Sequence, residues 1–223
     1  MDLGNHNFGH VGFQKTPLAE YQEAVLKGEV VTRALLQRRG RAPRYYRHTF
    51  TQTGPTREAK AAFEAFLADH GYAVAPFTVE HSDYVFAALY ADALEARDEA
   101  QARKISEAYL AQLDTALAHF ENESRELFGR EIPQILLIHA NRLNAAALGA
   151  MLDRLQGRGY RFVTLDEALR DPAYASPDDY IGPAGPSWLH RFFVARGRDM
   201  MTSLRAEPDP PPFVLDAYRA LRR

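Results

Sequence analysis

One short apolar run constrains the fold more than any other feature of this sequence. Ile135-Leu136-Leu137-Ile138 lies directly between Gln134 and His139, with no polar residue inside the run. Consecutive aliphatic residues without alternation are typical of a strand that is covered on both faces, as in a parallel sheet. We therefore predict a buried strand over 132–140. Helix-like and strand-like segments alternate around it, an order typical of βαβ units, so we predict an α/β fold.

The remaining elements follow from periodicity and from Pro, Gly and hydroxyl punctuation. Helices are predicted over 16–40, 56–70, 82–128 (with a break at 96–104) and 144–156, with a helical turn over 165–170. Strands are predicted over 44–50, 72–78 and 160–164. Pro, Gly and Asp are frequent over 171–186 and 208–212, which indicates loops. We expect one domain over 1–170 and a Pro/Gly-rich tail over 171–223 that packs on it.

Composition excludes several classes of function. The 223 residues include no cysteine, so disulfides, iron–sulfur clusters and a cysteine nucleophile are excluded, and any metal must be held by His, Asp or Glu. The balance of 27 Lys+Arg against 29 Asp+Glu gives a net charge of −2, which argues against a nucleic-acid partner. The apolar runs are far shorter than the roughly 20 residues of a membrane span.

A pair of histidines near the start is the first candidate site. His6 and His10 have an H-x-x-x-H spacing, which on a helical turn places both imidazoles on one face, where they can reach one cation. Gly4 and Gly9 flank the pair and allow tight backbone turns. The alternative is a pair of surface histidines without a ligand.

His139 is the second candidate, because it follows the apolar strand directly. The carboxyl ends of parallel strands carry reactive groups at an open rim. An imidazole there can act as a general acid, since its ordinary pKa lies near neutrality. The alternative is a buried neutral histidine with a structural hydrogen bond.

Asp83 stands at a junction between a strand and a helix, where two roles are open. An Asp in that position is commonly a helix N-cap. It can also hydrogen-bond an imidazole and hold it oriented and protonated.

The stretch from Arg33 to Arg47 is the most basic part of the chain. With its interleaved aromatic residues it could bind nucleic acid, although a solvated helix end has the same composition. Within it, Arg47 could instead pair with a catalytic carboxylate and lower the pKa of that carboxylate.

Taken in order, these four segments resemble the polysaccharide deacetylase family, also called the NodB-homology domain. H-x-x-x-H, an aromatic-Arg-x-x strand end, Asp-aromatic and Leu-x-His are similar to the family's second to fifth motifs. The resemblance covers about residues 1–169, and the segments 162–169 and 187–191 also look like those of bacterial members. It implies a distorted (β/α) barrel of mostly parallel strands with outer helices, here without its first strand.

The resemblance also implies an activity, the metal-dependent hydrolysis of an acetyl group from an N-acetylated or O-acetylated oligo- or polysaccharide. The enzyme class would be a hydrolase acting on non-peptide carbon–nitrogen bonds. By this resemblance His6 and His10 bind a divalent metal, which we expect to be zinc, with cobalt or nickel as alternatives. The resemblance also implies that the protein acts in the periplasm or outside the cell.

The other matched positions receive roles in the same way. His139 corresponds to the catalytic acid, Asp83 to the residue that orients it, and Arg47 to the arginine that contacts the base. Further positions correspond to the oxyanion-binding backbone N–H, the apolar wall of the acetyl pocket, and the aromatic residue after the aspartate, namely Phe50, Leu137 and Tyr84.

Three departures from the family pattern affect the expected activity. The adjacent aspartates that supply the base and the third metal ligand have no match before His6, Thr49 replaces a proline, and Tyr84 replaces a tryptophan. We therefore expect a fragment that has lost its start, including any signal peptide, and has impaired activity. The alternative is a non-catalytic glycan-binding pseudoenzyme. The sequence leaves the oligomeric state open.

Overall fold

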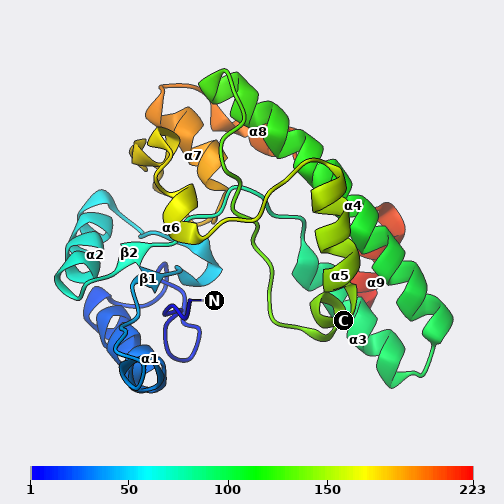
Figure 1. Ribbon diagram of the computed structural model, residues 1–223, viewed down its shortest axis with the longest axis horizontal. Coiled ribbons are helices and arrows are strands. Elements are labelled where there is room, and N and C mark those ends of the chain that lie inside the picture. Colours follow the sequence, from blue (N-terminus) through cyan, green and yellow to red (C-terminus); the bar gives the residue numbers. More distant parts are fainter. Residues whose placement is uncertain (1, 223) are drawn as a thin grey trace. The chain divides into compact units, whose positions relative to one another are not determined.

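The computed structural model describes residues 2–222, and the chain divides into two compact units (Figure 1). The first unit comprises residues 1–76 and 178–186, and the second unit comprises 77–177 and 187–223. Met1, where the expected domain begins, and Arg223 lie outside the described residues. The expected limits at 170 and 171 stay a prediction.

The first unit consists of two helices beside a short parallel sheet. Helix α1 spans Leu18–Gln37 and helix α2 spans Arg57–Asp69, and a 3₁₀ turn covers Thr49–Thr51. Strands β1 (Tyr45–Tyr46) and β2 (Ala73–Val74) pair in parallel, and Asn5 adds one parallel bridge to Tyr46. Helix α2 begins after Thr56, whose hydroxyl accepts a hydrogen bond from the backbone N–H of Ala59, a regular N-cap.

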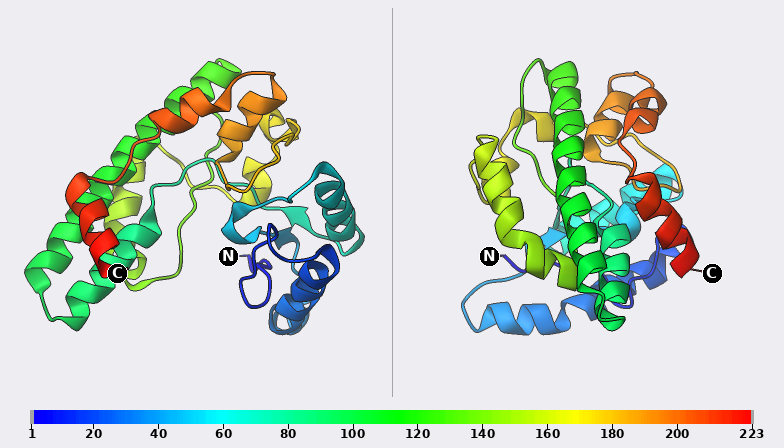
Figure 2. Two further views of the ribbon diagram at one scale, coloured as in Figure 1. Left: turned by 180° about the vertical axis from the view of Figure 1, so that it is seen from behind. Right: turned by 90° about the vertical axis from the view of Figure 1, so that its right-hand side faces the viewer.

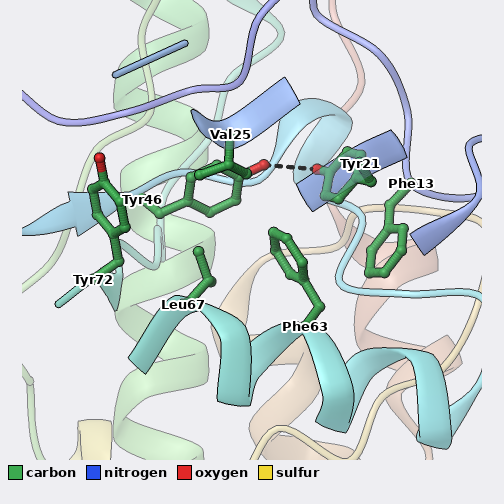
Figure 3. Packing of buried hydrophobic residues seen from close by; sticks show 7 residues of the cluster. All are labelled: Phe13, Tyr21, Val25, Tyr46, Phe63, Leu67 and Tyr72. Carbon is green, nitrogen blue, oxygen red and sulfur yellow. Dashed lines mark hydrogen bonds between the residues drawn. The ribbon is translucent and has the colours of Figure 1, made fainter. Parts of the chain in front are cut away.

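An aromatic cluster forms the core of the first unit (Figure 3). Its buried members come from both helices, both ends of the sheet and the loop before α1: Phe13, Tyr21, Val25, Tyr46, Phe63, Leu67 and Tyr72. The rings of Phe13 and Tyr21 stack with centroids 4.3 Å apart. The Tyr46 hydroxyl donates a 2.9 Å hydrogen bond to that of Tyr21, so both phenols are satisfied inside the core.

Residues 178–186 belong to the first unit because polar contacts hold them there. The buried Lys60 ammonium lies 2.7 Å from the Asp178 carboxylate. The Gln14 amide donates to the Gly182 carbonyl over 2.8 Å, and the Thr51 hydroxyl donates to the Gly185 carbonyl over 2.6 Å. The loop that was predicted for this stretch is therefore ordered by side chains from elsewhere in the unit.

The second unit is a group of helices around α4. Its helices are α3 (Asp83–Glu95), α4 (Glu99–Phe128), α5 (Arg142–Gly157), α6 (Leu165–Ala168), α7 (Trp188–Ala195), α8 (Met200–Ala206) and α9 (Pro212–Leu221), with a 3₁₀ turn at Pro172–Ala175. Figure 2 shows α5 on one side of α4 and the C-terminal helices on the other. Buried residues such as Ile105, Tyr109, Leu113 and Phe120 recur along α4 at helical spacing. Among residues 2–222, no helix is long and apolar enough to cross a bilayer.

The expected (β/α) barrel is wrong, because the fold is mostly helical. The only sheet among the described residues has two strands of two residues each. The apolar run Ile135–Ile138 makes a single parallel bridge, between Val79 and Leu136, and its four residues are only half-buried. A strand needs partners along its length, and hydrophobicity alone does not supply them. The strand predicted over 160–164 is also absent from the structure.

The C-terminal region holds three helices that the composition did not indicate. Pro and Gly mark the loops between them, but α7 itself is deeply buried through Trp188, Leu189, Phe192 and Phe193. Its N-cap is Ser187, whose hydroxyl accepts from the backbone N–H of Leu189.

The aromatic core yields a stability prediction. Phe63 is fully buried among aromatic neighbours, so Phe63→Ala should lower the free energy of unfolding by about 3–5 kcal/mol. The control is Leu35→Ala on α1, where the side chain is 48% exposed and the change should be within about 0.5 kcal/mol. Urea unfolding measures both, and equal effects would contradict the assigned core.

Candidate functional site

A buried carboxylate and an exposed imidazole form the best-defined polar pair of the second unit. Asp83 is the first residue of α3 and its carboxylate is buried, whereas 49% of the His139 side chain is exposed. Asp83 Oδ1 lies 2.7 Å from His139 Nδ1, and Oδ2 accepts the His139 backbone N–H over 2.8 Å. The sequence separation is 56 residues, so the pairing is a product of the fold.

Two asparagines complete the surroundings of Asp83. Asn144, on α5, donates its amide to Asp83 Oδ2 over 2.8 Å, and Asn141 donates to the same oxygen over 3.3 Å. Asp83 makes no cap contact of the expected kind, since Ser82 occupies the N-cap position in a left-handed conformation and its side chain forms no cap hydrogen bond. The carboxylate therefore orients the imidazole instead of capping the helix.

The charge state of Asp83 fixes the tautomer of its partner. Burial raises the pKa of Asp83, but the hydrogen bonds from His139 and Asn144 outweigh it and hold the pKa below its ordinary value. An ionised carboxylate only accepts hydrogen bonds, so Nδ1 of His139 must carry a proton. Proton exchange with a ligand is then left to Nε2.

Two other predicted residues of the second unit lie near this pair in the sequence. Tyr84 is 54% exposed, and its ring meets that of Tyr218 on α9 edge to face, with centroids 6.2 Å apart. Leu137 is half-buried, and its backbone N–H donates to the Val79 carbonyl over 2.9 Å. This hydrogen bond and the Val79–Leu136 bridge position the segment that ends at His139.

The predicted histidine pair belongs to the first unit. His6 and His10 are exposed, and their ring centroids lie 5.0 Å apart. His6 Nδ1 is 2.7 Å from the Arg47 carbonyl oxygen, the kind of contact that orients metal-binding imidazoles. The expected helical turn is wrong, since His10 and two of the residues between the pair, Asn7 and Gly9, have positive φ.

The histidine loop is held by Asn5 and by a glycine of α1. Asn5 is buried, and its side chain donates to the Val25 carbonyl over 2.9 Å and accepts from the Asn7 backbone N–H. At Gly28, a Cβ atom would come within 2.9 Å of the Asn5 side chain and the Asn7 backbone, so only glycine permits this approach.

Arg47 and Phe50 also belong to the first unit. Arg47 donates from its guanidinium to the Pro76 carbonyl over 3.1 Å, and burial lowers its pKa to about 10. Phe50 has φ of 50° and is 56% exposed, with its ring 4.6 Å from that of His10. The structure therefore brings His6, His10, Arg47 and Phe50 together in one unit, and Asp83, Tyr84, Leu137 and His139 belong to the other.

A third cluster was missed by the sequence analysis. His119 and Glu123 lie one turn apart on α4, and His190 lies on α7. Glu123 Oε1 is 3.1 Å from His119 Nε2 and 3.3 Å from His190 Nε2, and one ligand atom from each residue lies within 4.8 Å of the others. These three side chains could hold a metal ion. Burial raises the pKa of Glu123, but the two imidazoles outweigh it and lower that pKa.

The signal for this cluster was present but weak. His119 and Glu123 have an i, i+4 spacing within a stretch that was correctly predicted as helix, but such pairs are frequent on solvated helices. His190 lies 67 residues beyond Glu123, in a region expected to be a tail. Only packing of α7 on α4 brings the three together.

Comparisons with protein-family models, with curated proteins and with solved structures gave no match.

The Asp83 pair generates a prediction with a pH signature. Asp83→Asn turns an NH₂ group toward donors and should lower the free energy of unfolding by about 1–3 kcal/mol at neutral pH. Because the pKa of Asp83 is lowered, its stabilisation is present above the unfolded value of 3.8 and is lost as pH falls through the folded value. The gap between wild type and variant should therefore narrow below pH 3.8. The control is Asp92→Asn, on the exposed side of α3. If the stability difference between the wild type and Asp83→Asn did not change with pH, Asp83 would not be the stabilising ionised carboxylate.

His81 generates the second pH prediction. Burial lowers its pKa from 6.5 to about 4, although Asp83 and Glu80 oppose the shift. Between these values the unfolded chain binds a proton that the folded chain excludes, so stability falls as pH drops from 6.5 to 4. Relative to His81→Gln, the wild type should lose about 3 kcal/mol over this range in urea titrations.

The comparison with His81→Gln isolates this effect. Glu207 acts in the opposite direction, because burial and Glu80 raise its pKa to about 9, but its contribution is common to both proteins. A stability difference that stays constant from pH 6.5 to pH 4 would show that His81 is not excluded from protonation.

Proposed function

We propose that the chain takes part in metal-dependent hydrolytic deacetylation of an acetylated oligo- or polysaccharide. The observation that carries the proposal is the pairing of Asp83 with His139, 2.7 Å apart, with the carboxylate buried and the imidazole half exposed. A buried carboxylate that orients an exposed imidazole is a general acid–base arrangement. The motif order in the sequence supports the choice of an acetylated glycan as substrate.

The proposed role of His139 is to protonate the amine that leaves when the amide carbon–nitrogen bond breaks. Asp83 holds Nδ1 and favours the protonated ring, so Nε2 can deliver its proton to the leaving nitrogen. Without a proton the amine leaves poorly, so loss of His139 should affect an amide substrate severely.

The proposed metal ligands are His6 and His10 of the first unit. A divalent metal such as zinc, bound there, would lower the pKa of a bound water and polarise the acetyl carbonyl. The contact of His6 Nδ1 with the Arg47 carbonyl supports the role of His6 as a ligand, because it fixes the direction of the ring. Leu137 and the backbone N–H of Phe50 keep the roles that the resemblance gives them.

A second candidate function is glycan binding without catalysis. The specific observation in its favour is the state of the one acidic residue that precedes His6 in the given sequence. Asp2 is the only acidic residue before His6, and its carboxylate is ion-paired with Arg41 and, at 3.8 Å, with Arg44. The only acidic group of this segment is therefore engaged by two arginines.

Acetate release from N-acetylglucosamine oligosaccharides tests the proposal. We expect slow release, because the family's aspartate pair has no match before His6. This release should require added zinc and fall at least about 100-fold in His139→Ala, the range typical of a lost general acid. The double variant His6→Ala/His10→Ala should release no acetate, and added zinc should not restore the activity. His70→Ala, an exposed histidine at the end of α2, is the control and should retain full activity.

One outcome would contradict the role of His139, and another would contradict deacetylation itself. Zinc-dependent acetate release that is unchanged in His139→Ala would show that His139 is not the general acid. Oligosaccharide binding by calorimetry, with no acetate released at any zinc concentration, would establish the glycan-binding function instead.

A further inference from the structure

We propose that His119, Glu123 and His190 bind a divalent transition metal of the zinc class, and that this metal fastens α7 to α4. The site lies wholly within the second unit and shares no residue with the proposed deacetylation machinery. It is therefore independent of the proposed function.

The three side chains offer a set of ligand atoms that suits zinc. Two imidazoles and one carboxylate are ligands that zinc takes readily, and first-row metals from cobalt to copper take them as well. Mg²⁺ and Ca²⁺ prefer oxygen ligands alone, so the cluster discriminates against them.

The distances from Glu123 to the two imidazoles also suit zinc. In a tetrahedral zinc site with ligands at about 2.0–2.1 Å, neighbouring ligand atoms are about 3.3 Å apart. Glu123 Oε1 lies 3.1 Å from His119 Nε2 and 3.3 Å from His190 Nε2. One ligand nitrogen of each histidine lies within 4.8 Å of the other, so all three donor atoms lie close enough to reach one ion.

The ring nitrogens of His119 and His190 are not aligned for hydrogen bonds with Glu123. Both Nε2 atoms contact Glu123 at ion-pair distance, but among the described residues neither contact has the alignment that a hydrogen bond requires. The N–H directions of the rings therefore do not point at the carboxylate oxygen. His190 is 0% and Glu123 4% exposed, and buried polar atoms in this state are costly unless a ligand satisfies them.

A cavity beside the cluster supplies an entry path and room for a further ligand. It has a volume of about 420 Å³, and His119 and Glu123 form part of its wall. Ser203, on α8, lines the same cavity and has a buried hydroxyl without a hydrogen-bond partner among residues 2–222. A water molecule in this space can complete the metal coordination and hydrogen-bond to that hydroxyl.

Zinc-dependent thermal stability tests the site. The protein background is the full chain with His6→Ala and His10→Ala, so that the histidine loop does not contribute. After metal removal with a chelator, zinc at 100-fold above its Kd should raise Tm by about 5–10 °C, because it binds only the folded state. Magnesium at the same concentration should leave Tm unchanged.

A matched pair of variants localises the effect. Glu123→Gln in this background should abolish the zinc-dependent rise in Tm. Glu126→Gln should retain it, because Glu126 lines the same cavity but is exposed and ion-paired with Arg198. If Glu123→Gln does not fold, cobalt(II) titration of the parent protein decides, since a tetrahedral site with nitrogen ligands gives strong visible absorption.

Two results would show that no metal binds at His119, Glu123 and His190. A zinc-dependent rise that persists in Glu123→Gln, or the absence of both the rise and the cobalt absorption in the parent protein, would overturn the site. The three residues would then form a metal-free cluster of polar side chains between α4 and α7. Neither result bears on acetate release, so the two proposals fail separately.

Discussion

The hydrogen bonds of the Asp83 carboxylate hold the residues around His139 in place. The carboxylate is buried at the start of α3 and receives hydrogen bonds from the segment that ends at His139 and from α5. An uncompensated buried charge would be costly, so these donors and the carboxylate require one another. The hydrogen bonds of this carboxylate join α3 to α5, orient the exposed imidazole of His139 and fix its tautomer. The same contacts therefore determine both the stability of this region and its chemistry.

The second unit shows how a long helix can collect polar groups from distant parts of the chain. Helix α4 presents Tyr109 toward Asn144 on α5, and Glu123 toward His190 on α7. Each contact lies among buried apolar residues, where polar groups interact strongly and where an unsatisfied one is costly. The first unit uses a different solution, an aromatic core in which the hydroxyls of Tyr21 and Tyr46 satisfy each other.

The sequence predicted local structure better than long-range structure. The helices over 57–69, 99–128 and 142–157 follow from caps and periodicity, which act over a few residues. The barrel was wrong because an apolar run does not specify its pairing partners, and among the described residues Leu136 forms a bridge with Val79 alone. The Asp83–His139 contact was indicated by motif order, whereas the cluster around Glu123 was not, because His190 is brought to α4 only by packing of α7.

If Asp83 orients His139 as proposed, the neutral imidazole carries its proton on Nδ1, and the tautomer of that ring can be measured. Nitrogen-15 NMR of the histidine side chains, above the pH at which the ring loses its charge, identifies which nitrogen keeps its proton. We expect a proton on Nδ1 in the wild type, with this preference lost in Asp83→Asn. A neutral ring protonated on Nε2 in the wild type would show that Asp83 does not orient His139 in this way.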